Sequence, residues 1–292
     1  MTTSLSKILR TGATGNVGMA VIKALQKQNH LLDIITVVRD LEAASKKLAA
    51  YKVSFKKFDF TDPLTYKPAL QNCNKLFLLR PPQITESEKY FKPLVQAAKV
   101  NRVKHIIFLS VQGLEKNSII PHHKIEKQIL ANGIPYTFLR PEYFMQNFTT
   151  TLHNHLVNKG KIFLPAGNTK FTLVVVTDIG NVTAAILNDI SLDHNKAYDL
   201  FNTIKLTFKE MAQKLSRGLG VYISYQSSTL LNFFFTKRRE KLSTGNILVM
   251  FMLHYFPRFQ NEPAVTDCIK KITGIEPLEF VRFINHKKSL SQ

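Results

Sequence analysis

The sequence predicts an α/β protein: a doubly wound parallel sheet with helices on both faces, followed by a small, mostly helical C-terminal lobe. Two observations predict the sheet. Along the first half of the chain, short apolar runs alternate with helical patterns, as in successive βαβ units. A glycine-rich turn also joins the first apolar run to the first helix. In such folds ligands bind at the carboxyl ends of the strands.

The strands and helices are expected in a regular order. The first strand includes Ile8 and Leu9, and the second is the β-branched run at residues 34–38. Further strands are expected at residues 53–58, 75–79, 105–109 and 136–139. Helical patterns lie between them, at residues 41–50, 63–72, 85–101 and 121–132.

The turn after the first strand has the sequence Gly12-Ala13-Thr14-Gly15-Asn16-Val17-Gly18. Apolar residues then repeat at helical spacing: Val17, Ala20, Val21, Ala24 and Leu25. Gly12 and Gly15 leave space for backbone amides to approach a phosphate, and a helix N-terminus favours negative charge. Gly18 lets the helix pack closely on the strand.

This strand, turn and helix predict a Rossmann-type dinucleotide site. Its cofactor-binding residues are expected to be Gly12, Thr14, Gly15, Asn16, Val17 and Gly18. The spacing is Gly-x-x-Gly-x-x-Gly and not the commoner Gly-x-Gly-x-x-Gly, so a purely structural turn is the alternative. Arg10 is expected at the carboxyl end of the first strand, near the phosphates.

The residue after the second strand favours NADP(H) over NAD(H). An NAD-specific site places a carboxylate there to bind the ribose 2′-hydroxyl. This chain has Arg39, whose guanidinium suits the 2′-phosphate of NADP. NAD(H) stays open, because Arg39 as one more exposed cation, with Asp40 capping the next helix, is the alternative.

Composition indicates a globular chain with an unusual charge. There are 40 Lys and Arg residues against 20 Asp and Glu, which gives a net charge of +20. Such a field attracts anions, so the cluster Lys237-Arg238-Arg239-Glu240-Lys241 predicts either a weak contact with an anionic surface or a solvated helix face. No specific nucleic acid is expected, because there is no zinc finger or RNP-type motif.

The cysteine count and the N-terminal residues predict a cytoplasmic location. Cys73 and Cys268 offer neither a disulfide framework nor a metal-ligand cluster, so no metal is expected. The first residues lack the pattern of a signal peptide. The longest apolar run, at residues 247–253, is too short for a spanning helix.

Four motifs occur in one order along the chain. They are Thr11-Gly12-Ala13-Thr14-Gly15-Asn16-Val17-Gly18, Leu78-Leu79-Arg80-Pro81-Pro82, His122-His123-Lys124-Ile125-Glu126 and Leu139-Arg140-Pro141-Glu142-Tyr143-Phe144-Met145-Gln146-Asn147. With them the chain resembles the NmrA-like group of atypical short-chain dehydrogenases/reductases, which includes bacterial NAD(P)H azoreductases and quinone reductases. The resemblance extends to residues 196–200 and 265–283. It implies a Rossmann core at residues 1–203, with part of 155–170 reaching into a substrate lobe at residues 204–292.

The resemblance also implies roles for residues at the strand ends. Asp59 and Phe60 would flank the adenine, and Leu79 and Arg80 the adenosine ribose and pyrophosphate. The nicotinamide would lie against three residues: Pro141, Tyr143 and Phe144. Pro81 and Ser110 follow the fourth and fifth strands, and they are expected to line the same cofactor cleft.

The chain departs from the wider superfamily at the proton donor. The expected Tyr-x-x-x-Lys pair is absent after Ser110, with His122 in place of the lysine and Ser118 in place of the tyrosine. A register shifted by one residue would instead use His123, four residues before Lys127.

His122 is therefore the main catalytic candidate, with Ser110 and Tyr143 as lesser donors. The alternative, weighted equally, is that His122 only binds the cofactor ribose or caps its helix. Glu126 would either orient His122 or form a surface ion pair, with one of three lysines: Lys127, Lys124 or Lys104.

Three functions follow from these features. The first is an NAD(P)H-dependent oxidoreductase that transfers hydride to a flat hydrophobic acceptor, such as a quinone or an azo compound, which can take its proton from solvent. The aromatic residues from Phe233 to Phe256 are expected to form the lid of the substrate lobe, with the alternative that most of these rings belong to its core. The second is a non-catalytic NADP(H) sensor that acts through a regulatory protein partner. The third is a basic binder of nucleic acid or of a membrane surface.

Overall fold

The computed structural model describes residues 6–12, 14–28, 32–114, 120–189, 193–259 and 266–290. The chain forms two compact units. Unit 1 comprises Met1–Glu142, Val176–Leu200 and Cys268–Glu276, and unit 2 comprises Tyr143–Val175, Phe201–Asp267 and Pro277–Gln292. The chain first enters unit 2 at Tyr143. The sequence suggested a boundary after residue 203, with part of 155–170 reaching into the substrate lobe, and this division stays a prediction.

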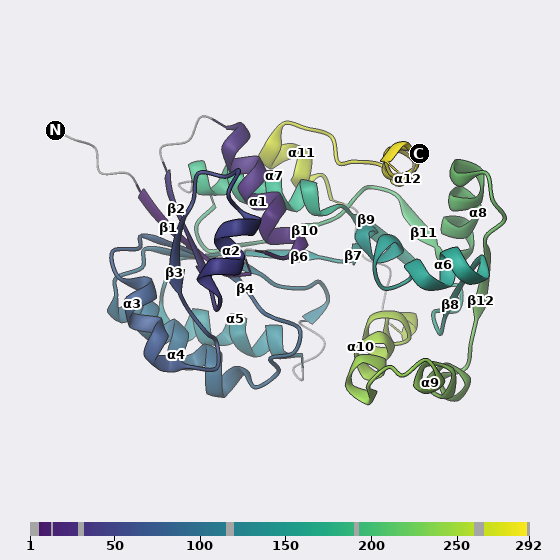
Figure 1. Cartoon of the computed structure of the whole chain (residues 1–292), viewed down its shortest axis with the longest axis horizontal. Helices are drawn as coiled ribbons and strands as arrows, with labels where there is room; N and C mark the ends of the chain where they lie inside the picture. Colours follow the sequence, from purple (N-terminus) through teal and green to yellow (C-terminus); the bar gives the residue numbers. More distant parts are fainter. Residues whose placement is uncertain are drawn as a thin grey trace. The chain divides into compact units, whose positions relative to one another are not determined.

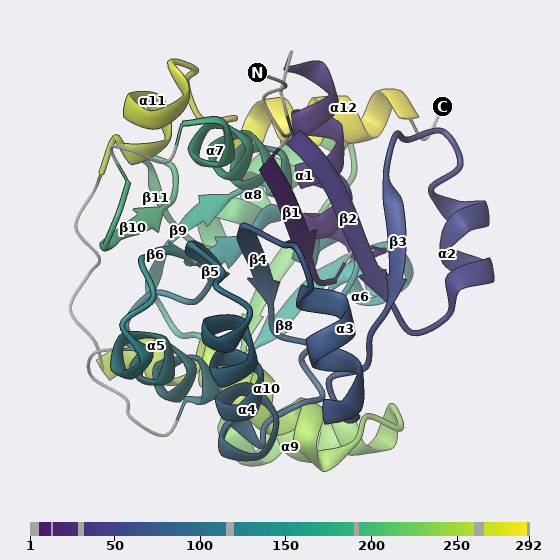
Figure 2. The same ribbon diagram turned by 90° about the vertical axis from the view of Figure 1, so that its left-hand side faces the viewer.

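Unit 1 contains a seven-stranded sheet in which all pairings are parallel, in the order β10-β6-β5-β4-β1-β2-β3 (Figure 2). Its strands are β1 (Ser6–Arg10), β2 (Leu32–Val38), β3 (Ser54–Lys57), β4 (Lys75–Leu79), β5 (His105–Leu109), β6 (Tyr136–Pro141) and β10 (Lys196–Leu200). The strand order reverses between β1 and β4, the position where doubly wound sheets bind their ligands. The predicted doubly wound parallel sheet is confirmed.

Helices cover both faces of this sheet (Figure 1). They are α1 (Asn16–Lys27), α2 (Leu41–Lys47), α3 (Tyr66–Leu70), α4 (Ser87–Val100), α5 (Pro121–Asn132), α7 (Val176–Asn188) and α11 (Cys268–Thr273), with a 3-10 turn η1 (Pro63–Thr65) before α3. Because α1 and α7 lie on one face and α3, α4 and α5 on the other, the central strands are buried on both sides. Their sequences are therefore continuous apolar runs.

Unit 2 combines helices with two small sheets. The sheets have the orders β11-β9-β7 and β12-β8. Their strands are β7 (Tyr143–Phe144), β8 (Lys161–Leu164), β9 (Lys170–Val174), β11 (Lys205–Thr207) and β12 (Ser224–Ser227). The helices are α6 (His153–Lys159), α8 (Phe208–Leu219), α9 (Leu230–Arg239), α10 (Thr244–His254) and α12 (Phe280–Leu290), with 3-10 turns η3 (Met145–Thr149) and η4 (Phe256–Phe259).

Aromatic side chains form much of the core of unit 2. Phe208 packs against Phe171 and Tyr143, with ring centroids 5.1 and 5.4 Å apart. Phe233, expected in a lid, is fully buried in this core. Phe235, two residues later, is 59% exposed. In the described parts of the chain, no helix has both the length and the apolar character needed to cross a bilayer.

Gly180 allows the close packing of α7 against α1, the helix that begins at the glycine turn. A Cβ at Gly180 would lie 2.7 Å from the carbonyl carbon and oxygen of Ala20, which are backbone atoms. The two helices would have to move apart to accept it. We expect Gly180→Ala to lower the free energy of unfolding by about 2 kcal/mol, measured by urea titration.

Gly245 in α10 is the matched control, because a Cβ there has no atom within 4 Å. Gly245→Ala should leave stability unchanged or raise it by up to about 1 kcal/mol, since alanine favours helix. If both variants lost the same free energy of unfolding, the close packing of α1 and α7 would be contradicted.

Candidate functional site

The glycine turn and the first turn of α1 form the centre of the candidate site. Gly12 has a φ of +64°, which favours glycine, and its carbonyl accepts a 3.2 Å hydrogen bond from the Gly15 amide. Gly15 is the N-cap of α1, so no side chain caps the first-turn amides. These amides and the helix dipole suit an anion at this end of α1.

Thr11 holds this turn against β4. Its hydroxyl accepts a 2.7 Å hydrogen bond from the Leu79 amide and donates one of 3.2 Å to the Leu79 carbonyl. As a result, a Cβ at Gly12 would lie only 2.8 Å from Cδ1 of Leu79. The structure thus brings together Gly12 and Leu79, which the sequence placed in one cleft.

Two further elements, α2 and the end of β2, each contribute a cation, one at the turn and one near Asp59. Lys47 of α2 donates a 2.9 Å hydrogen bond from Nζ to the Thr14 carbonyl. Arg39, at the end of β2, is exposed and close enough to Asp59 to affect its titration. Burial raises the pKa of Asp59, but two hydrogen bonds from Thr61 and the charge of Arg39 outweigh it, so the net shift is downward.

Phe60, predicted beside the adenine, belongs to the core of unit 1. Its ring is 7% exposed, and its centroid lies 4.9 Å from that of Phe58 and 5.2 Å from that of Phe91. Its carbonyl accepts a 2.6 Å hydrogen bond from the Tyr66 hydroxyl. The ring therefore has little free surface for a base, and the predicted role of Phe60 stays a prediction.

Arg80 stabilises the loop after β4. Its Nη1 atom donates to three loop carbonyls, those of Pro81, Pro82 and Ile84, at 3.1, 3.1 and 2.7 Å. Its Nε atom donates to Nε2 of His122, on α5, at 3.4 Å. Arg80, Pro81 and His122 therefore lie close together, and their predicted roles at the cofactor stay predictions.

His122 is held as a neutral imidazole. Burial, with the nearby charge of Arg80, lowers the pKa of His122 to about 3. Because Nε2 accepts from Arg80, the ring proton is assigned to Nδ1. A neutral imidazole is a weak acid, so the predicted proton donation by His122 gains no support from this geometry.

Ser110 and Pro141 lie at the ends of β5 and β6. Ser110 is 2% exposed, and its hydroxyl has no hydrogen-bond partner among the described residues. The carbonyl of Pro141 accepts from the Gln112 amide at 3.2 Å. A buried hydroxyl without a partner costs free energy, so Ser110 is available to a bound ligand.

Glu126 pairs with Arg140 and not with a surface lysine. Both carboxylate oxygens bind the guanidinium, Oε1 to Nε at 3.1 Å and Oε2 to Nη2 at 2.7 Å. Glu126 is only 5% exposed. The expected surface ion pair is therefore wrong, because the carboxylate is buried between α5 and β6. Ser118, aligned with the usual tyrosine, lies outside the described residues.

Tyr143 and Phe144 belong to unit 2. Tyr143 is 4% exposed, and its hydroxyl lies 3.3 Å from Nε2 of His254. Nδ1 of His254 is 2.7 Å from the Met250 carbonyl, so it carries the proton and Nε2 accepts from Tyr143. Burial raises the pKa of Tyr143 above its usual range and lowers that of His254 to about 4. The roles predicted for Tyr143 and Phe144 stay predictions.

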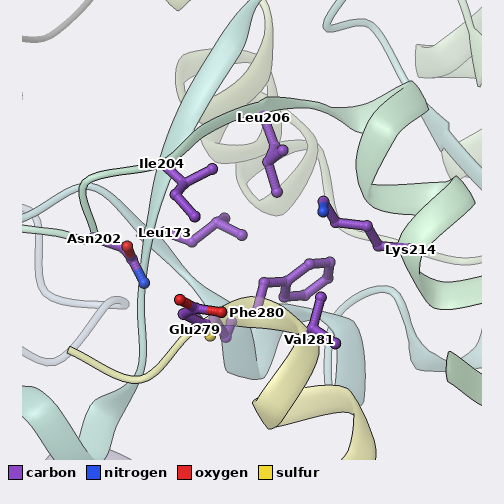
Figure 3. A pocket seen from close by; sticks show the side chains of 9 residues that line it. Leu173, Asn202, Ile204, Leu206, Lys214, Glu279, Phe280 and Val281 are labelled. Atoms are coloured by element: carbon purple, nitrogen blue, oxygen red, sulfur yellow. The ribbon is translucent and has the colours of Figure 1, made fainter. Parts of the chain in front are cut away.

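Unit 2 also contains a small, partly open pocket (Figure 3). Its walls are largely apolar, and three polar side chains, those of Asn202, Lys214 and Glu279, lie at its edge. None of the residues predicted to bind the cofactor lines this pocket.

The basic cluster in α9 is partly internal. Lys237 is 5% exposed, and its Nζ atom lies 2.9 Å from both Nε2 of His155 and Oε2 of Glu240. The expected contact with an anionic surface is therefore wrong for Lys237, because the side chain is buried and paired. Arg238, Arg239 and Lys241 are exposed.

Comparison with known proteins identifies the family, because the model of the NmrA-like family matches residues 4–267. The chain belongs to the NmrA-like family. This NmrA-like protein is 28% identical to an NAD(P)H azoreductase of Xenophilus azovorans, over 94% of the chain and 96% of the relative. It is 26% identical to quinone oxidoreductase 2 of Escherichia coli, over 76% and 78%. A solved structure of Citrobacter sp. triphenylmethane reductase complexed with NADP(H) matches with a TM-score of 0.85 and 25% identity, over 96% of the chain and 99% of the reductase.

Sequence reasoning missed several residues of the site in this NmrA-like protein. Thr11 belongs to the glycine motif, but its contacts with β4 depend on strand pairing, which the motif does not show. Lys47 reaches the turn from α2 across 33 positions of the sequence. Arg140 did carry one signal in the sequence. It is a charged residue at the end of an apolar strand, and such a charge requires a partner when it is buried.

The neutral state of His122 makes stability depend on pH. Its folded pKa of about 3 lies below the unfolded value of about 6.5, so the unfolded chain binds a proton first as the pH falls. Stability that is full above about pH 6.5 is therefore lost toward pH 3. We expect about 2 kcal/mol of loss from this group between pH 7 and pH 5.

Urea titrations at the two pH values measure this loss. His122→Asn should reduce it by about 2 kcal/mol relative to the unmodified chain. The exposed His153 is the control, and His153→Asn should leave the loss unchanged. An identical loss in all three proteins would show that His122 has the same pKa in the folded and unfolded chains.

Proposed function

We propose that the protein is an NADPH-dependent oxidoreductase that transfers hydride to a flat hydrophobic acceptor, such as a quinone or an azo compound. One observation carries the proposal: the cradle formed by Gly12, Gly15 and the uncapped start of α1 beside β4. A Cβ at Gly12 would fill it, and Ser110 adds a buried hydroxyl that has no partner in the part of the chain that the structure describes. These features fit a dinucleotide, and the azoreductase and quinone oxidoreductase relatives support the same chemistry.

The residues of unit 1 would divide the binding of NADPH between them. The amides of the glycine turn would bind the pyrophosphate, and Arg39 the 2′-phosphate. Asp59 would lie near the adenine, and Arg80 would hold the loop that closes on the ribose and pyrophosphate. NADPH supplies the hydride, so the protein has to orient the two reactants and exclude water.

The proton is proposed to come from solvent. A quinone that accepts hydride becomes a hydroquinone anion, and an azo compound becomes a hydrazine anion. Either can take a proton from water, so neither requires a strong acid in the protein. This agrees with the neutral state of His122, which would position Arg80 instead of donating a proton.

Titration with NADPH, followed by addition of an acceptor, tests the proposal. We expect NADPH to bind with a dissociation constant in the micromolar range. Addition of a quinone or an azo dye should then oxidise it, which is measured as a loss of absorbance at 340 nm. The rate should show no inflection between pH 5 and 8 from His122, since its pKa is about 3. Tight binding without turnover would favour the NADP(H) sensor, and no binding would contradict both functions.

Arg39 provides a second test, of cofactor preference. Arg39→Gln removes the charge that would face the 2′-phosphate, so the dissociation constant of NADPH should rise about tenfold. That of NADH, which lacks this phosphate, should stay within about twofold. The exposed Arg217 of α8 is the charge-matched control, and Arg217→Gln should change neither constant. If the dissociation constants of NADPH and NADH changed by the same factor, Arg39 would have no part in the preference for NADPH.

A further inference from the structure

Arg10 is a fully buried arginine beneath the glycine turn. It is the last residue of β1, and its side chain is 0% exposed. The guanidinium donates through Nη1 to the Gly18 carbonyl and through Nη2 to the Thr36 hydroxyl, the latter at 3.2 Å. Within the described ranges of the chain, its Nε atom has no hydrogen-bond partner. Among the described residues, no carboxylate forms an ion pair with Arg10.

This arrangement is unfavourable in the chain by itself. Arginine stays protonated inside proteins, and a buried charge without a counter-ion carries a large desolvation cost. Burial lowers the pKa of Arg10 to about 9, still above physiological pH. The two hydrogen-bond partners are neutral, so they satisfy donors without balancing the charge.

The position of Arg10 beside α1 makes a second unfavourable contribution to the stability of the chain without ligand. Gly18 is the third residue of α1, so the hydrogen bond to its carbonyl places the guanidinium beside the first turn of this helix. The amides of this turn form the positive end of the helix dipole. A cation near the start of a helix is destabilising unless an anion is also present.

We propose that Arg10 is a buried countercharge for the phosphates of the dinucleotide, which weakens the free chain and strengthens its binding. The inference rests on the proposed function, because an anion at the turn is what balances the charge. Two positive groups, the α1 amides and Arg10, then act on the same phosphates from one side. Because Arg10 is shielded from water, salt screens its attraction much less than that of an exposed cation.

The competing explanation is that Arg10 is a structural clamp between α1 and β2. The two explanations differ in the sign of one effect. Replacing a clamp by an apolar side chain of similar length weakens the free chain. Replacing an unbalanced buried charge leaves the free chain equally stable or stabilises it, as has been found when apolar residues replace buried ionic groups.

The test compares Arg10→Met with the unmodified chain in two measurements, urea unfolding without nucleotide and calorimetric titration with NADPH. We expect Arg10→Met to raise the dissociation constant of NADPH tenfold or more. The urea midpoint of the free variant should be equal to, or higher than, that of the unmodified chain. The dissociation constant reports on binding of the ligand, whereas the urea midpoint reports on the protein alone.

Thr36→Val is the matched control, because it removes a partner of the guanidinium and keeps the charge. It should lower the urea midpoint and leave the dissociation constant of NADPH within about threefold. The pattern for Arg10→Met is the reverse, and no purely structural role produces both patterns.

Several results would overturn the inference. One is an Arg10→Met chain that is unfolded, or that has a lower urea midpoint than the unmodified chain. Another is binding of NADPH within twofold of the unmodified value. If the unmodified chain itself does not bind NADPH, the proposed function fails; if it binds and Arg10→Met binds equally well, only the role of Arg10 fails.

Discussion

The contact between the end of β1 and the end of β4 is the constraint on which the candidate site depends. The Thr11 hydroxyl binds both the amide and the carbonyl of Leu79, which fixes the two strand ends side by side at the reversal of strand order. Gly12 then has to turn beside Leu79, with no space for a Cβ. The start of α1 follows from that turn, so the position of its free amides is set by strand pairing and not by the helix alone.

The same pairing explains which parts of the fold were predictable from sequence. The strands β2, β4, β5 and β6 are largely buried, so each contains a short apolar run. In β1 only Ile8 and Leu9 are apolar, and the glycine turn after them gave the stronger signal. In contrast, β10 is an edge strand whose first residues are exposed, and its sequence has no such signal. The sheets of unit 2 pair segments far apart in sequence, such as Lys161 with Ser224. No local pattern indicates such a partner.

The candidate site was predictable to a similar degree and for similar reasons. The glycines were recognisable because their conformational requirement is local. The partners of charged residues were not, because they depend on which helix crosses which strand. Glu126 binds Arg140 across α5 and β6, and Arg80 binds His122 across the end of β4 and α5. Burial also changes the chemistry of a residue after its place is known, as in the neutral imidazole of His122.

Exposed and buried cations would act on a phosphate ligand in different ways. Arg39 is solvated, so its attraction is screened by salt and its cost to the free chain is small. Arg10 is dehydrated during folding, so the cost is already met before a ligand arrives, and no water has to be removed from it on binding. A net charge of +20 raises the local concentration of anions over the whole surface. Under the proposed function, the cations at fixed positions in unit 1, unlike this general field, would act together with the amides of the glycine turn on one bound dinucleotide.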